Sequence, residues 1–219
     1  MSIEQNLKEI KKNLLEGVTL VAVSKTKPVA DLQEAYDCGQ RIFGENKVQE
    51  MVQKWEALPK DIQWHMIGHV QRNKVKYMAE FVSLIHGVDS FRLLKEINKQ
   101  AKKYNRIIKC LLQIHIAEED TKFGLNENEL NEILSSKEFA SMENINIVGL
   151  MGMATFTQNE VQVRREFKRL KSTYDELQEN LADMNVLSMG MSGDYMMAIE
   201  EGSNMVRIGS SIFGARNTY

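Results

Sequence analysis

Two short segments near opposite ends of the chain carry the residue types that could do chemistry. The first, residues 20–25 (LVAVSK), is an apolar stretch of strand character that ends in Lys25. The second, residues 205–211 (MVRIGSS), is a similar stretch that carries Arg207 and ends in glycine and serine. A desolvated lysine amine can lose its charge and attack an aldehyde to form a Schiff base, whereas glycine and serine supply donors for a phosphate.

The alternation of side chains along the first stretch gives Lys25 a direction. Val21, Val23 and Lys25 share one side of the strand. If the valines fill the interior of a barrel, Lys25 points into the mouth at the C-terminal end, where the active sites of such barrels lie. A solvated lysine just past a strand is the simpler alternative for this residue taken alone. We expect Lys27 to be the solvated one, because Pro28 directs the chain away from the strand.

The segments after the last two strand-like stretches could bind a phosphate. Gly209 and Ser210 follow the last stretch, and Ser192 follows the preceding one and opens a short helix expected near residues 194–201. Barrel phosphates commonly bind to the loops after strands seven and eight, at the N-terminus of a short helix. Ordinary turn and capping chemistry would suit either segment by itself. An amine beside such a phosphate site suggests pyridoxal phosphate (PLP).

Arg207 shares its strand side with Met205 and Gly209, which predicts that it faces the barrel interior. A buried arginine keeps its proton and must be hydrogen-bonded or paired. Placed at a pyridine nitrogen, it would donate a hydrogen bond and disfavour protonation of the ring. The alternative is an ion pair with a barrel carboxylate such as Glu45 or Asp89.

Three further polar residues lie at strand ends. Asn46 could reach the ring hydroxyl of such a ligand or the lysine, although turn capping suits it equally. His65 and His69 flank another strand, but no carboxylate cluster with the spacing of metal ligands accompanies them. The sequence therefore predicts no metal site, and it leaves the role of the two histidines open.

The elements that must position these residues follow a repeating pattern. Amphipathic helices fill most gaps between the strand signals, with Ser90 and Asn126 as N-caps, and another covers residues 1–16. The strand signals lie at residues 20–25, 41–45, 62–67, 81–88, 107–116, 146–153, 185–191 and 205–210. The pattern predicts an α/β fold, a single (β/α)8 TIM barrel over residues 1–219 with an extra N-terminal helix. The alternative is an open α/β sheet with a misread edge strand.

Composition excludes several classes of protein. The 219 residues include 28 basic and 30 acidic ones, for a net charge of −2, and no basic stripe of the kind that binds nucleic acid stands out. No apolar run approaches the roughly 18 residues of a membrane span, and the charged N-terminus does not fit a signal peptide. Cys38 and Cys110 are far apart, which fits a reducing cytoplasm and no disulfide scaffold.

Several ordered motifs together give the chain a family likeness. It resembles the pyridoxal phosphate homeostasis proteins (YggS-like or PROSC-like) over nearly its whole length. The resemblance implies the fold of the N-terminal barrel of alanine racemase. It also implies that Lys25 forms the Schiff base, that Arg207 faces the pyridine nitrogen, that Ser192, Gly209 and Ser210 hold the phosphate, and that Asn46 lies beside the cofactor. The matching segments are Val21-Ala22-Val23-Ser24-Lys25-Thr26-Lys27-Pro28, Phe43-Gly44-Glu45-Asn46, Trp64-His65-Met66-Ile67-Gly68-His69, Gly190-Met191-Ser192 and Val206-Arg207-Ile208-Gly209.

The function this implies is reversible binding of PLP in vitamin B6 homeostasis, with the cofactor buffered or delivered to apo-enzymes by a monomer in the cytoplasm. A PLP-dependent amino-acid racemase, a Schiff-base aldolase and an interaction-only protein are the rivals. Racemisation needs acid–base groups on both faces of the substrate. In the racemases that share this barrel, a tyrosine supported by an additional C-terminal domain serves the second face, whereas this sequence ends at Tyr219. We therefore expect no efficient catalysis.

Overall fold

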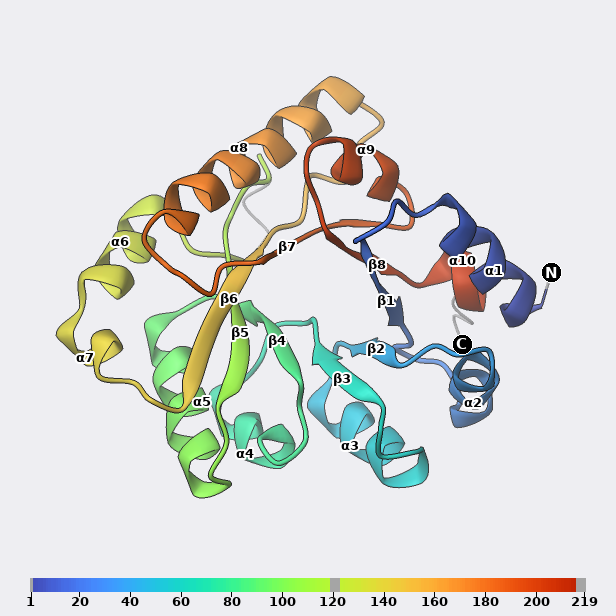
Figure 1. Ribbon diagram of the computed structural model, residues 1–219, viewed down its shortest axis with the longest axis horizontal. Coiled ribbons are helices and arrows are strands. Elements are labelled where there is room, and N and C mark those ends of the chain that lie inside the picture. The colour runs from blue at the N-terminus through green and yellow to red at the C-terminus, as the bar shows by residue number, and fades with distance from the viewer. Residues whose placement is uncertain (1, 119–122, 216–219) are drawn as a thin grey trace.

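The structure is a computed structural model and describes residues 2–118 and 123–215. Eight parallel strands form a closed barrel in which each strand pairs with the next along the chain and the last pairs with the first (Figure 1). The strands are β1 (Thr19–Val23), β2 (Ile42–Glu45), β3 (Gln63–Met66), β4 (Leu84–Val88), β5 (Ile108–Gln113), β6 (Ile145–Met151), β7 (Val186–Met191) and β8 (Met205–Ile208). Closure confirms the predicted barrel and rules out the open sheet.

Helices lie outside the strands, and one precedes the barrel as predicted. They are α1 (Ile3–Asn13), α2 (Val29–Asp37), α3 (Val48–Ala57), the 3₁₀ helix η1 (Arg72–Lys74), α4 (Val75–Met78), α5 (Phe91–Lys103), α6 (Glu127–Ser135), α7 (Lys137–Ala140), α8 (Glu160–Gln178), α9 (Tyr195–Glu200) and α10 (Ser210–Phe213). The two predicted N-caps are confirmed, because Ser90 accepts from the N–H of Leu93 and Asn126 forms a capping box with Glu129. The extra helix α1 lies beside α10, and the Asn6 side chain donates to the carbonyl of Ile212 at 2.8 Å.

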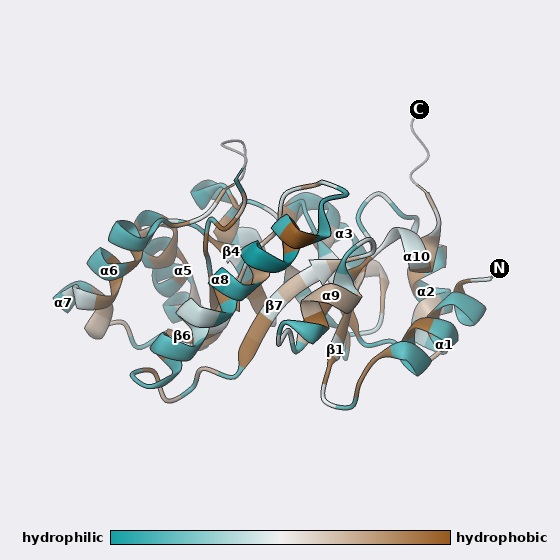
Figure 2. Ribbon diagram, turned by 90° about the horizontal axis from the view of Figure 1, so that it is seen from above, coloured by the Kyte–Doolittle hydropathy of each residue, from teal (hydrophilic) through white to brown (hydrophobic). Residues whose placement is uncertain are grey.

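The apolar residues form two layers, one on each side of the strands. A large layer between strands and helices includes Leu20, Ala22 and Trp64, and a small cluster in the barrel interior includes Val21 and Met205. Successive residues of β1 thus face opposite sides, as the alternation of a strand requires. In Figure 2, hydrophobic residues colour much of the strands, whereas hydrophilic and hydrophobic residues alternate along the surrounding helices.

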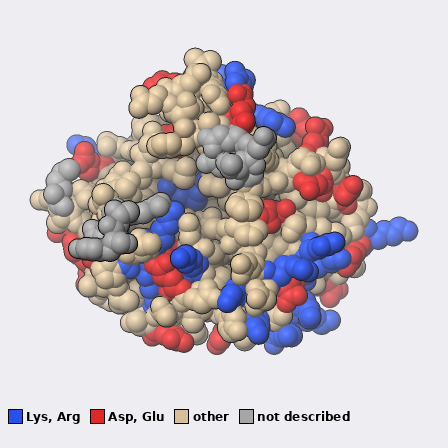
Figure 3. Space-filling model, turned by 180° about the vertical axis from the view of Figure 1, so that it is seen from behind, with Lys and Arg blue, Asp and Glu red and all other residues tan. Residues whose placement is uncertain are grey.

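The surface carries both signs of charge. On the face shown in Figure 3, lysine and arginine side chains are interspersed with aspartate and glutamate. Among the helices of residues 2–118 and 123–215, none combines the length and apolar character needed to cross a membrane. The two cysteines are free thiols, Cys110 buried and Cys38 half-buried, as the sequence predicts.

Candidate functional site

Lys25 stands just beyond the C-terminal end of β1, at the mouth of the barrel. The preceding Ser24 points outward, because its hydroxyl donates to Glu45 Oε1 at 2.6 Å. Lys25 is half-buried and lies in the turn that follows, and its direction into the barrel mouth stays a prediction from the alternation along β1. Thr26, the next residue, has a φ of 64°, a left-handed conformation that a threonine adopts only when its surroundings hold it there.

A buried ion network behind the barrel wall holds this turn. Lys54 of α3, 4% exposed, donates to the Ser24 carbonyl, to Glu45 Oε1 and to Glu50 Oε1, each at 2.7 Å. Glu50 Oε1 also accepts the N–H of Thr26 at 2.5 Å. Burial raises the pKa of the Glu45 carboxyl against the opposing effect of Lys54. The network fixes the backbone on both sides of Lys25, and sequence reasoning missed it, although Glu50 and Lys54 are spaced i, i+4 on one helix.

Lys27 differs from the sequence expectation. Its amine donates to the carbonyls of Phe213 at 2.7 Å and Ala215 at 2.9 Å, so it ties the turn after β1 to the end of α10. The prediction of a solvated lysine was therefore wrong. Lysine at the carbonyl end of a helix is a favourable capping arrangement, and it connects the first and last segments of the barrel at the mouth.

Arg207 faces the barrel interior as its parity predicts and is 3% exposed. Its Nη1 donates to the Ser188 carbonyl at 2.9 Å and to Ser188 Oγ at 2.6 Å, and its Nη2 donates to the Gly152 carbonyl at 3.1 Å. The alternative of an ion pair with Glu45 or Asp89 is not realised, because Lys54 binds Glu45 and His69 pairs with Asp89 at 2.7 Å. Burial lowers the pKa of Arg207 to about 10, so the guanidinium remains charged at neutral pH.

The segments after β7 and β8 meet, as expected of a phosphate-binding pair of loops. The N–H of Gly209 donates to Ser192 Oγ at 3.2 Å. A Cβ at Gly209 would lie 3.0 Å from the Val23 carbonyl oxygen, so glycine permits the close approach of this segment to β1. Ser210 is exposed in the first turn of α10. The short helix expected near residues 194–201 is confirmed as α9, whose caps are Asp194 and Glu201, but its N-cap is Asp194 and Ser192 lies in the turn before it.

The remaining predicted residues lie at the same end of the barrel but do not form one cluster. Asn46 is half-buried directly after β2. His69 stacks on the ring of Phe123 with centroids 4.3 Å apart and pairs with Asp89, whereas His65 is buried in the interior beside His86. Within residues 2–118 and 123–215, no group of three or more His, Cys, Asp or Glu side chains is arranged to hold a metal ion.

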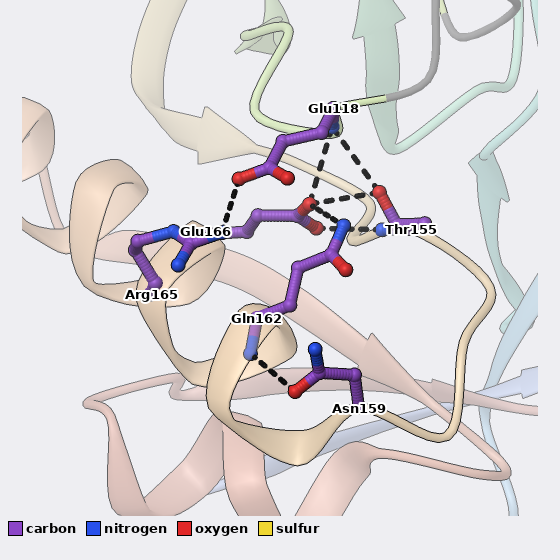
Figure 4. A network of polar contacts seen from close by, with 6 residues as sticks. All are labelled: Glu118, Thr155, Asn159, Gln162, Arg165 and Glu166. Atoms are coloured by element: carbon purple, nitrogen blue, oxygen red, sulfur yellow. Dashed lines mark hydrogen bonds and ion pairs between the residues drawn. The ribbon is translucent and has the colours of Figure 1, made fainter.

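A second polar network joins α8 to the segments that follow β5 and β6 (Figure 4). Glu166 of α8 is 2% exposed and accepts from Thr155 N at 2.6 Å, Thr155 Oγ1 at 2.8 Å, Glu118 N at 3.1 Å and Gln162 Nε2 at 3.1 Å. Burial alone raises the pKa of this carboxyl, but these hydrogen bonds outweigh it and hold the pKa below its ordinary value. One carboxylate therefore fixes the segments that follow β5 and β6. Arg165 adds an ion pair to the Glu118 side chain.

Comparison with known proteins first shows the class of fold to which the chain belongs. The family model described as the N-terminal domain of alanine racemase matches residues 1–217. The structure superimposes on an alanine racemase from Clostridium difficile with a TM-score of 0.79 at 18% identity, covering 99% of this chain and 56% of that one. At this level of identity the likeness concerns the fold alone.

More similar relatives give the particular family. A pyridoxal phosphate homeostasis protein of Aquifex aeolicus is 42% identical over 200 residues, which cover 90% of this chain and 86% of the relative. That of Pasteurella multocida is 37% identical and covers 99% of both chains. The PipY protein of Synechococcus elongatus, solved with and without PLP, is 33% identical, with TM-scores of 0.88 and 0.91 over 97% of this chain and all of PipY. The chain therefore belongs to the family of pyridoxal phosphate homeostasis proteins.

The network behind Lys25 makes a prediction about stability. Replacing Lys54 with methionine leaves the buried Glu45 carboxylate without its cation, which costs about 3–5 kcal/mol when a buried pair is broken on one side. Adding Glu45→Gln removes the stranded charge, so Lys54→Met/Glu45→Gln should recover much of that loss. Urea denaturation of the single and double variants measures both effects. A double variant no more stable than Lys54→Met contradicts the charge argument.

The Glu166 network predicts a pH-dependent stability. Because the folded-state pKa is lowered, the stabilisation is complete above the ordinary value of 4.5 and is lost as pH falls through the folded-state pKa. Glu166→Gln should therefore lower the free energy of unfolding by about 1–3 kcal/mol at pH 7. The difference from the wild type should shrink below about pH 4.5. Exposed Glu143→Gln is the control, and a Glu166→Gln effect that is constant with pH refutes this account.

Proposed function

We propose that this chain binds PLP reversibly at the mouth of its barrel, with Lys25 as the covalent attachment point. The observation that carries the proposal is the convergence of three donor types at the β1–β8 seam. Lys25 follows β1, Arg207 lies on β8 opposite Val21, and Gly209 contacts Ser192 across the last two loops. When bound, PLP supplies an aldehyde that reacts with amines, a pyridine ring and a phosphate dianion.

The residues present fit that group. An amine suits the aldehyde, and the hydroxyls of Ser192 and Ser210 with the backbone at Gly209 suit the phosphate. Arg207 lies deeper than Lys25, where the Nε–H and second Nη2–H, which bind no acceptor among the described residues, could donate to the ring nitrogen. Asn46 would lie beside the cofactor at the end of β2.

We further infer a carrier rather than an efficient enzyme, acting in PLP homeostasis as the names of the relatives suggest. Arg207 keeps its proton at neutral pH and so disfavours protonation of the ring nitrogen, which leaves the ring a weaker electron sink than one facing a carboxylate. The function proposed includes delivery of PLP to apo-enzymes by a monomer in the cytoplasm, with residues 1–219 as one domain.

Lys25→Ala tests the attachment point. Titrated with PLP, reduced with borohydride and digested, the wild type should carry one pyridoxyl adduct on Lys25, identified by mass spectrometry. Lys25→Ala should lose the adduct and keep its circular dichroism, because Lys25 lies in a turn outside the helices and strands that give that signal. Lys27→Ala is the matched control and should retain the adduct. An adduct found mainly at another lysine refutes the assignment.

The carrier proposal predicts that the protein exchanges the Cα proton of amino acids only slowly. Holo-protein incubated in deuterium oxide with L-alanine and other amino acids should show negligible Cα exchange and racemisation, because Lys25 serves one face and Arg207 leaves the ring a poor electron sink. Chiral chromatography and mass spectrometry measure both. Turnover at an ordinary enzymatic rate, roughly 1–1000 per second, that disappears in Lys25→Ala would establish the racemase instead.

A further inference from the structure

A line of hydrogen-bonded side chains crosses the barrel interior beneath the mouth. It runs from Arg207 on β8 to Ser188 on β7, then to His86 on β4 and His65 on β3. Arg207 Nη1 lies 2.6 Å from Ser188 Oγ, Ser188 Oγ lies 3.0 Å from His86 Nδ1, and His86 Nε2 lies 3.0 Å from His65 Nδ1. All four side chains are at most 4% exposed. They lie among apolar interior residues, where an unmatched polar atom is costly.

The available donor hydrogens fix which side chain donates and which accepts at each step of this line. Arg207 can only donate, so Ser188 Oγ accepts from it. Among the described contacts, the acceptor offered to the Ser188 hydroxyl hydrogen is His86 Nδ1. His86 is then protonated on Nε2 and donates to His65 Nδ1, which leaves His65 protonated on Nε2 as well. Both rings are neutral, because burial lowers the pKa of His65 to about 3 and that of His86 well below 6.5.

The same line holds the guanidinium in one orientation. The two hydrogens of Nη1 are taken by the carbonyl and the hydroxyl of Ser188, and one hydrogen of Nη2 is taken by Gly152. Within the described part of the chain, the Nε–H and the second Nη2–H of Arg207 have no acceptor, so these two groups are left for a ligand. A hydroxyl that donates to a ring nitrogen becomes a better acceptor, so His86 strengthens the bond that Ser188 accepts from Arg207.

We propose that His86 is a positioning residue for ligand recognition: through Ser188 it orients Arg207 toward the ring nitrogen of a pyridine ligand. The proposal deepens the proposed function and rests on it for the identity of the ligand. His65 serves as the final acceptor and fixes the tautomer of His86. The four residues come from strands that are not all neighbours, so the line also couples opposite walls of the barrel.

The first test needs neither ligand nor variant protein in its main arm. Nitrogen-15 NMR of the cofactor-free protein at pH 7 should show His86 and His65 with unprotonated Nδ1 and protonated Nε2. The chain has four histidines, so single substitutions assign the signals. A His86 protonated on Nδ1, or one that titrates between pH 6 and 8, overturns the direction of the line and with it the proposal.

The second test compares two nearly isosteric substitutions. His86→Asn keeps an amide oxygen near the position of Nδ1 as an acceptor for Ser188, whereas His86→Leu has none. Both remove the partner of His65 and leave similar space, and urea denaturation of each variant checks that both are folded under the conditions of the titration. The ligands are PLP and its carbocyclic analogue, in which a C–H replaces the ring nitrogen, and dissociation constants are measured by equilibrium titration.

The wild type and His86→Asn should prefer PLP to the analogue by about tenfold or more, as expected of a hydrogen bond to a charged donor. His86→Leu should lose most of that preference while binding the analogue as well as His86→Asn does. An unchanged preference in His86→Leu refutes the positioning role. Failure of the wild type to bind PLP at all refutes the proposed function instead, and the tautomers still report on the line itself.

Discussion

The pairing of β1 with β8 is the constraint on which the rest of the structure depends. It closes the barrel and sets Val21 opposite Arg207, so residues almost two hundred positions apart become neighbours across a strand pair. The phosphate-type loop after β8 then approaches the strand that carries Lys25, and Gly209 permits the contact with Val23. Lys27 reinforces the seam by donating to the carbonyls of Phe213, the last residue of α10, and of Ala215 beyond it.

The buried charges near the mouth are all matched by polar partners. Lys54 is matched by two carboxylates, and Arg207 by carbonyl and hydroxyl oxygens. The difference has a consequence for chemistry. A guanidinium held by neutral oxygens keeps its charge with no carboxylate bound to it, so its remaining N–H groups stay strong hydrogen-bond donors. This arrangement supports the proposal that the interior recognises a ring that accepts a hydrogen bond.

The barrel and the sides of its strands could be predicted because alternation in strands and periodicity in helices are local properties. The inward direction of Arg207 and the outward direction of Ser24 follow from them. The contacts of Lys54, Glu166 and His86 could not be predicted in the same way. They depend on the stagger between strands, including the register shifts between β4 and β5 and between β7 and β8, which a single sequence does not contain. Lys27 was misjudged for the same reason, since its partners lie at the other end of the chain.

The central claim is that the mouth of the barrel recognises both the phosphate and the pyridine ring of PLP. A pair of titrations, with and without the phosphate on the ligand, tests this claim most directly. Purified protein is titrated with PLP and, separately, with pyridoxal, and the absorbance of bound ligand gives each dissociation constant. The two ligands share the aldehyde and the ring and differ in the phosphate. The account predicts that PLP binds about a hundredfold or more tightly than pyridoxal, because several donors at Ser192, Gly209 and Ser210 meet a dianion. Equal dissociation constants for the two ligands would contradict it.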